Sequence, residues 1–222
     1  QPLYDVMKLL GKETLIPEAA NRPVFFAAPL IGFGALLVLS AMLWMNSFGR
    51  QQAWLGDSIA AIYLLVVPSL ALILGGSSSG SPHAAVGTAR EMKLVVAYEF
   101  PLLLAFIVVL VKTATFLQVS AAEGRMLDLP VIAGGVPVFS ISGLLAFAVA
   151  LLCVQAKLGF IPFEIAEAET ELAGGVLIEY SGPLLAIWKL MQALMLVALP
   201  LFLILLFLGG FGAWGILKYV LI

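Results

Sequence analysis

The stretch PLLAIWKLMQALMLVALPLFLILLFL, residues 183–208, decides the fold class. It is apolar almost throughout, and its apolar residues do not alternate with polar ones as they do in a membrane β-strand. About 20 apolar residues in a helix cross a hydrocarbon core of roughly 30 Å. The stretch therefore predicts an α-helix that spans a membrane.

The same apolar pattern recurs along the chain. Four further ranges show it: 24–46, 58–76, 94–117 and 133–156. We expect an all-α, polytopic transmembrane bundle of about five spans, and a truncated sixth span could begin near Phe211. Segment 1–22 gathers its apolar side chains on one helical face, which favours an amphipathic helix in the membrane interface or a helix packed on a partner. The predicted division is this interfacial segment and one transmembrane domain, 23–222.

The composition supports a membrane protein. The chain of 222 residues is 63% hydrophobic and 11% charged, with a mean hydropathy of +1.13, which leaves too little polar surface for a soluble globule. The net charge of -2 and the lack of any lysine or arginine run exclude nucleic acid as a partner. A small excess of basic residues in the connections predicts that segment 157–182 faces the cytoplasm.

The chain is poor in metal ligands. It has one cysteine, Cys153, and one histidine, His83, so it cannot supply a four-cysteine iron–sulfur site or a tetrahedral zinc site by itself. We expect a buried inert thiol and a solvated imidazole, no metal or cofactor in this chain, and any redox centre in a partner subunit. The sequence has no phosphate-binding loop and no plausible catalytic triad, so catalysis by this chain alone is not supported.

Acidic residues gather in segment 157–182, just before the last span. It holds five of the thirteen acidic residues: Glu164, Glu167, Glu169, Glu171 and Glu179. In a helix Glu164, Glu167 and Glu171 would share one face, where mutual repulsion raises pKa values and lets carboxylates share protons. Charge alone slightly favours a solvated loop that docks on a basic partner. The interleaved apolar residues and glycine pairs favour a half-buried re-entrant segment instead.

Glu99, in VVAYEFPLLLAF, is a carboxylate inside an apolar span with no cation beside it. A charged side chain at that depth costs at least about 2.5 kcal/mol, so it pairs, faces the bundle interior or binds a proton. We favour a proton site over an interfacial glutamate hydrogen-bonded to Tyr98. An autonomous proton-coupled transporter that uses Glu99 is a further alternative; it predicts internal repeats, and none is visible.

Three stretches carry a family resemblance. PFEIAEAETELAGGVLIEYSG, QPLYDVMKLLGKE and AREMKLVVAYEFPL resemble, in order, the acidic signature, the interfacial helix and a helix entry of the complex I membrane subunit called subunit 1 or H. The resemblance implies further spans at both ends, so the chain looks truncated. It also implies a proton path through Glu99 and the five glutamates of segment 157–182. The residues implied in docking or support are Arg90, Tyr98, Phe163 and Tyr180.

Departures from that signature indicate a branch. Phe160 stands where complex I subunits usually have arginine, Glu164 replaces an aspartate and Ala166 a proline. The pattern is more similar to the homologous subunit of archaeal, ferredoxin-using, membrane-bound [NiFe] hydrogenases. The resemblance then implies a non-catalytic coupling and anchoring subunit that links proton reduction to H⁺ or Na⁺ translocation.

The hydrogenase resemblance also implies the surroundings of the chain. The expected partners are hydrogenase large and small subunits, an iron–sulfur subunit, antiporter-like membrane subunits and the lipid bilayer. The [NiFe] centre and the iron–sulfur clusters would lie in those partners. A quinone-reducing complex I and a sulfur-reducing relative stay open as alternatives.

Overall fold

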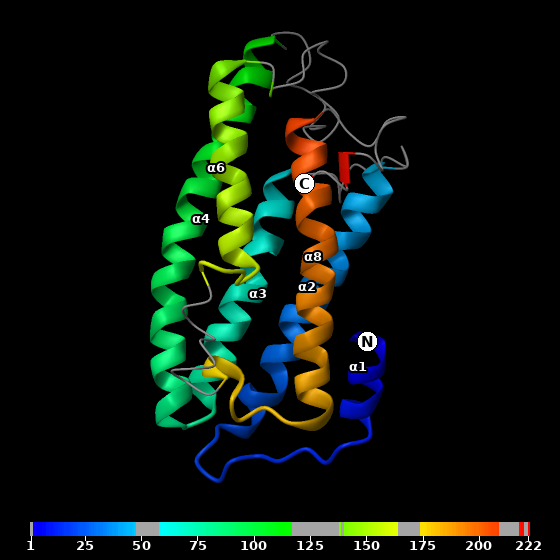
Figure 1. Cartoon of the computed structure of the whole chain (residues 1–222), viewed down its shortest axis with the longest axis vertical. Helices are drawn as coiled ribbons and strands as arrows, with labels where there is room; N and C mark the ends of the chain where they lie inside the picture. The colour runs from blue at the N-terminus through cyan, green and yellow to red at the C-terminus, as the bar shows by residue number, and fades with distance from the viewer. Residues whose placement is uncertain are drawn as a thin grey trace. The chain divides into compact units, whose positions relative to one another are not determined.

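The computed structural model describes residues 2–47, 58–116, 138, 140–163, 174–208, 218–219 and 222. The regular elements among them are all helical, as predicted. The α-helices are α1 (Pro2–Leu10), α2 (Arg22–Ser47), α3 (Ser58–Ser78), α4 (Pro82–Phe116), α6 (Ile141–Lys157) and α8 (Gly182–Phe207), and a short 3₁₀ helix, η2, covers Gly175–Leu177 (Figure 1).

Four described helices, α2, α3, α4 and α8, are long and apolar enough to cross a membrane. The predicted spans 24–46, 58–76 and 183–208 are confirmed with ends that differ by one or two residues. The fifth, α6, is apolar but shorter than predicted over its described length, and it begins at Ile141. Residues 133–137 and the predicted sixth span, near Phe211, lie outside the described residues.

Helix α4 begins twelve residues earlier than the predicted span at 94. Pro82 occupies its first turn, where the missing N–H costs no helical hydrogen bond, and the N–H of Ala85 donates to the carbonyl of Ser81 at 3.0 Å. The added turns carry charged side chains, which lower hydropathy without breaking a helix. Hydropathy therefore marked the apolar part of α4 and missed its polar start.

The chain forms two compact units, each built from three stretches. Unit 1 comprises Gln1–Leu37, Leu65–Ala97 and Gln155–Met195. Unit 2 comprises Val38–Leu64, Tyr98–Val154 and Leu196–Ile222. The long helices contribute residues to both units, whereas α1 and η2 belong to unit 1 and most of α6 belongs to unit 2.

Helix α1 confirms the predicted N-terminal helix. Tyr4, Met7 and Leu10 are exposed on it, as expected of a helix with an apolar side, although its place in a membrane interface stays a prediction. After α1 the chain runs without helix to α2 and is held within unit 1. The N–H of Leu15 donates to Oγ of Ser181 at 2.9 Å, and the N–H of Asn21 donates to the carbonyl of Ser78 at 2.9 Å.

An aromatic cluster of Phe25, Tyr180 and Trp188 forms part of the core of unit 1, and all three side chains are buried. The rings of Phe25 and Tyr180 stack with centroids 4.1 Å apart, and Trp188 meets Tyr180 edge to face at 5.7 Å. The hydroxyl of Tyr180 donates to the carbonyl of Phe25 at 3.2 Å. The cluster fixes the residues just before α8 against the start of α2.

Helix η2 docks in a slot made by two glycines, Gly76 of α3 and Gly87 of α4, which we call the glycine slot. Val176 of η2 is fully buried there. A Cβ atom at Gly87 would lie 2.9 Å from the backbone nitrogen of Val176, closer than real Cβ atoms approach. The slot therefore holds the chain immediately after segment 164–173 in a defined place.

Unit 2 has an apolar core. Leu39, Leu43, Phe106, Phe202 and Phe207 are buried in it, and the rings of Phe147 and Phe207 meet at 5.4 Å. Among its described residues, the buried side chains with polar or ionisable groups are Ser40, Tyr98, Glu99 and Cys153. Of these, Glu99 is the carboxylate, a group that is costly to bury unless it is paired or hydrogen-bonded.

Candidate functional site

Glu99 lies near the middle of α4, seventeen residues after Pro82 and seventeen before Phe116. Its side chain is only 8% exposed, and it lies within the apolar stretch of α4 that is long enough to span a membrane. The apolar part of α4 begins near residue 94, so Glu99 lies inside it and is buried instead of exposed at the polar start of the helix. The position therefore favours an intramembrane carboxylate, which pairs or takes up a proton.

Two polar side chains of unit 2 accompany Glu99. Tyr98, its neighbour on α4, is buried, and Cys153 of α6 lies close enough for the Glu99 charge to act on its thiol. Cys153 is buried, as predicted for a thiol in an apolar helix. Glu99, Tyr98 and Cys153 are thus three buried side chains of unit 2 with ionisable groups.

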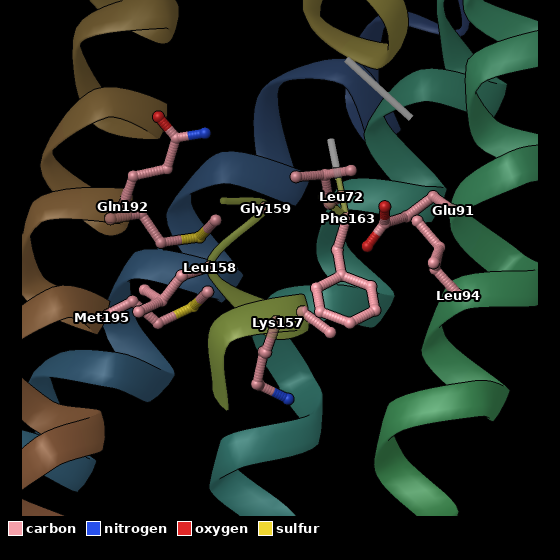
Figure 2. A pocket seen from close by; sticks show the side chains of 11 residues that line it. Leu72, Glu91, Leu94, Lys157, Leu158, Gly159, Phe163, Gln192 and Met195 are labelled. Carbon is pink, nitrogen blue, oxygen red and sulfur yellow. The ribbon is translucent and has the colours of Figure 1, made fainter. Parts of the chain in front are cut away.

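A pocket with a volume of about 60 Å³ lies wholly within unit 1. It is bounded by α3, α4, the end of α6 with the turn that follows it, and the middle of α8 (Figure 2). The lining residues are Leu72, Glu91, Leu94, Ala156, Lys157, Leu158, Gly159, Phe163, Met191, Gln192 and Met195. We call it the Glu91 pocket.

Three polar side chains line the otherwise apolar Glu91 pocket: Glu91 of α4, Lys157 of α6 and Gln192 of α8. Figure 2 shows the Glu91 carboxylate directed toward the side where Leu72 and Phe163 lie. Lys157 is only 6% exposed, which is rare for a lysine. The pocket therefore combines an acid, a buried cation and an amide.

The end of α6 positions Lys157. The N–H of Phe160 donates to the carbonyl of Gln155 at 3.3 Å, and the N–H of Gly159 donates to that of Ala156 at 3.1 Å, the hydrogen bonds of a Schellman motif. Gly159 has φ of 68°, a conformation that favours glycine. Lys157 lies in the last helical turn, where the helix dipole favours a cation.

The other predicted site residues have separate places. Phe163 lines the Glu91 pocket, and Arg90 is half-buried on α4 beside Glu91. Tyr180 belongs to the aromatic cluster, and Glu179 precedes it, half-buried. These four belong to unit 1, whereas Glu99 and Tyr98 belong to unit 2. The predicted path residues Glu164, Glu167, Glu169 and Glu171 lie outside the described residues, so their role stays a prediction.

Burial raises the pKa of Tyr180 to about 12, an effect that exceeds the lowering by the Ser78 and Trp188 side chains. Its hydroxyl is therefore protonated at neutral pH and remains a donor to the Phe25 carbonyl. This favours a supporting role within the chain for Tyr180 over proton exchange.

Sequence reasoning missed Glu91, Lys157 and Gln192 as site residues. In AREMK, Glu91 is flanked by basic residues and looks like part of a solvated helix face. Lys157 entered only the count of basic residues in connections. Gln192 carried a usable signal, because it is a polar residue inside the apolar stretch 183–208 and therefore needs a polar environment.

Comparison with known proteins identifies the family of the chain. The family profile described as NADH dehydrogenase matches residues 1–222. The membrane subunit denoted H of the NADH-quinone oxidoreductase of Geobacillus thermodenitrificans is 30% identical over 226 residues, which cover 99% of this chain and 64% of the relative. The same subunit of Thermomicrobium roseum is 33% identical and aligns with 95% of this chain and 64% of its own length.

A solved structure shows the same fold. A chain in the structure of the membrane-bound sulfane sulfur reductase, an archaeal respiratory membrane complex, superposes on this chain with a TM-score of 0.82 and 24% sequence identity. The superposition covers 100% of this chain and 73% of the other chain. The chain spans less than two thirds of the length of the two NADH-quinone oxidoreductase relatives described above. Its apolar helices and these relatives make it a multi-pass membrane protein, and it belongs to the NADH dehydrogenase family, that of complex I subunit 1.

Proposed function

We propose that the chain anchors and couples a multi-subunit respiratory complex in which intramembrane carboxylates exchange protons during ion translocation. One observation carries the proposal: a chain of the complex I subunit 1 family buries Glu99 within the apolar stretch of α4. Burying an ionisable side chain inside a membrane helix costs several kcal/mol. Such carboxylates therefore usually take part in ion or proton transfer.

The chemistry follows from the position of Glu99. The proposal assigns Glu99 the binding and release of a proton, which a nearby change of charge would drive. Electron transfer in a docked redox arm would supply that change through segment 164–173. Protons would then redistribute along the carboxylates toward ion-translocating membrane subunits.

For the type of complex, we propose the hydrogenase branch. Phe160, Glu164 and Ala166 support it, because they depart from the quinone-using signature. The described turn exposes Phe160 and Ile161 after α6, which suits docking of a partner on that side. Ferredoxin-driven proton reduction would take place at the [NiFe] and iron–sulfur centres of partner subunits. Segment 157–182 would face the cytoplasm, and H⁺ or Na⁺ would be translocated.

A quinone-reducing complex is the second candidate. The relatives at 30% and 33% identity are named as subunits of NADH-quinone oxidoreductases, which favours a quinone as the electron acceptor. The sulfane sulfur reductase shares the fold at 24% identity, so sulfur reduction is a third outcome that the same experiment separates.

The test is to isolate the complex from native membranes through a tag on this chain and to identify its partners by mass. The complex then receives reduced ferredoxin, and hydrogen release, reduction of a soluble quinone and reduction of polysulfide are measured separately. We expect hydrogenase subunits and hydrogen release. Quinone or polysulfide reduction without hydrogen would replace the hydrogenase branch, and isolation of the chain without redox partners would refute the coupling function itself.

A further inference from the structure

The Glu91 pocket is the right size for water and too small for an aromatic ring. A cavity needs about 15 Å³ of accessible volume for each water, whereas an apolar cavity that binds benzene measures about 150 Å³. A volume of about 60 Å³ therefore accommodates a small cluster of about two to four waters, since a water occupies about 30 Å³ in the liquid. Glu91, Lys157 and Gln192 supply the polar partners that such waters need.

The pocket brings a carboxylate, an ammonium group and an amide from three helices to one small space. A buried ammonium group is costly unless an opposite charge and polar groups compensate it. Glu91 of α4 lines the same pocket as Lys157 with a group of opposite charge, and Gln192 offers both a donor and an acceptor. The other basic groups near Glu91 in the sequence are Arg90 and Lys93 on α4. Lys157 is the basic residue that lines the pocket.

We propose that the Glu91 pocket is a hydrated proton-exchange site in which Glu91 accepts and releases the proton and Lys157 holds the balancing charge. A hydronium ion among the waters gives a proton to the Glu91 carboxylate, an O–H bond forms, and a water remains. Release is the reverse step. Lys157 keeps its three N–H bonds throughout, so its charge favours the release of the proton. This inference rests on the proposed function and adds a site to it.

A static ion pair is the competing account of the same residues. It predicts that removal of either charge weakens assembly or thermal stability while coupling in the assembled complex stays normal. Filling the pocket without changing any charge would then have no effect on coupling. The number of ions translocated per electron therefore distinguishes a proton-exchange site, which predicts a lower ratio in these variants, from a static ion pair, which predicts an unchanged ratio.

The test uses the whole complex in inside-out vesicles and measures ions translocated per electron transferred. Glu91→Gln and Lys157→Met are expected to lower this ratio at least about tenfold, as for loss of a proton-transfer group, and Lys157→Arg is expected to restore most of it. Leu72→Phe fills the pocket and should lower the ratio as well. Leu74→Phe on the exposed side of α3 is the matched control and should leave it unchanged.

A second pocket-filling variant and a spectroscopic measurement guard against failures of folding. Leu94→Phe fills the pocket from α4, so the hydration test survives if Leu72→Phe does not assemble. Infrared difference spectra taken on reduction of the complex should lose a carboxyl signal in Glu91→Gln. They should keep it in Glu18→Gln, which alters an exposed carboxylate. An unchanged spectrum in Glu91→Gln would overturn the inference.

Glu99→Gln separates failure of this inference from failure of the proposed function. If Glu99→Gln lowers the ratio while Glu91→Gln and Leu72→Phe keep the wild-type value, the pocket plays no part and the proposed function stands. If all three keep the wild-type value, both proposals are wrong.

Discussion

The two units of the chain differ in the surroundings of their charged side chains. Among the described residues, unit 1 places opposite charges, Glu91 and Lys157, at one small pocket and buries several hydroxyl groups. Unit 2 buries one described carboxylate, Glu99, in a largely apolar core. The contrast teaches that the same residue type meets two environments along α4: a small pocket shared with Lys157 and Gln192 at Glu91, and a largely apolar core at Glu99.

The largest effect is expected from Glu99→Lys. It would put an ammonium group near the middle of α4 in unit 2, at a cost of about 2.5 kcal/mol or more, and no assembled complex should be recovered from membranes. Size-exclusion chromatography of the tagged complex measures this. Glu18→Lys, at an exposed site, should assemble normally. Normal assembly of Glu99→Lys would mean that the environment of Glu99 is as polar as that of Glu91.

A smaller effect is expected from Gly87→Ala in unit 1. The added methyl group would clash with the backbone of Val176 in the glycine slot, and overpacking of this kind costs about 1–3 kcal/mol. Thermal unfolding of the complex should therefore begin at a lower temperature. The matched control is Gly34→Ala, because a Cβ atom there meets no heavy atom within 4 Å. Equal melting temperatures for the two variants would show that η2 is not held by the slot.

The smallest effect is expected from Tyr180→Phe. It removes the hydrogen bond to the Phe25 carbonyl and should lower the free energy of unfolding by about 1 kcal/mol at neutral pH. The folded-state pKa of Tyr180 is about 12, above its usual value of 10. Between those values the unfolded chain loses the proton and the folded chain keeps it, so stability should fall as pH rises.

Thermal unfolding between about pH 10 and about pH 12 measures the predicted fall of stability with pH. The wild-type complex and Tyr63→Phe, which changes an exposed tyrosine, should lose stability from about pH 10 to about pH 12, and Tyr180→Phe should lose less. The same pH dependence in all three would show that Tyr180 is not the buried tyrosine that resists ionisation.

The sequence allowed the helices to be predicted well because long apolar runs have few alternatives in a membrane. Glu99 was predictable for the same reason, since it interrupts such a run. Glu91 and Lys157 were not, because their neighbours in sequence are polar and only tertiary packing brings α4, α6 and α8 around one pocket. The cluster of Phe25, Tyr180 and Trp188 likewise depends on contacts between residues far apart in the chain.

The early start of α4 shows the same limit at the level of a single helix. Residues 82–93 form regular helix although their side chains include His83, Arg90 and Lys93, which a hydropathy window discounts. Hydropathy reports where a helix could contact lipid. It does not report where the helix begins.

The most direct test of the account is the number of ions translocated per electron in vesicles that contain the complex with Glu99→Gln. Glutamine has nearly the same shape and cannot bind or release the proton. The account predicts assembly and electron transfer near wild-type levels, with the ion-to-electron ratio reduced at least about tenfold. A wild-type ratio in the assembled Glu99→Gln complex would contradict the claim that this buried carboxylate takes part in ion translocation.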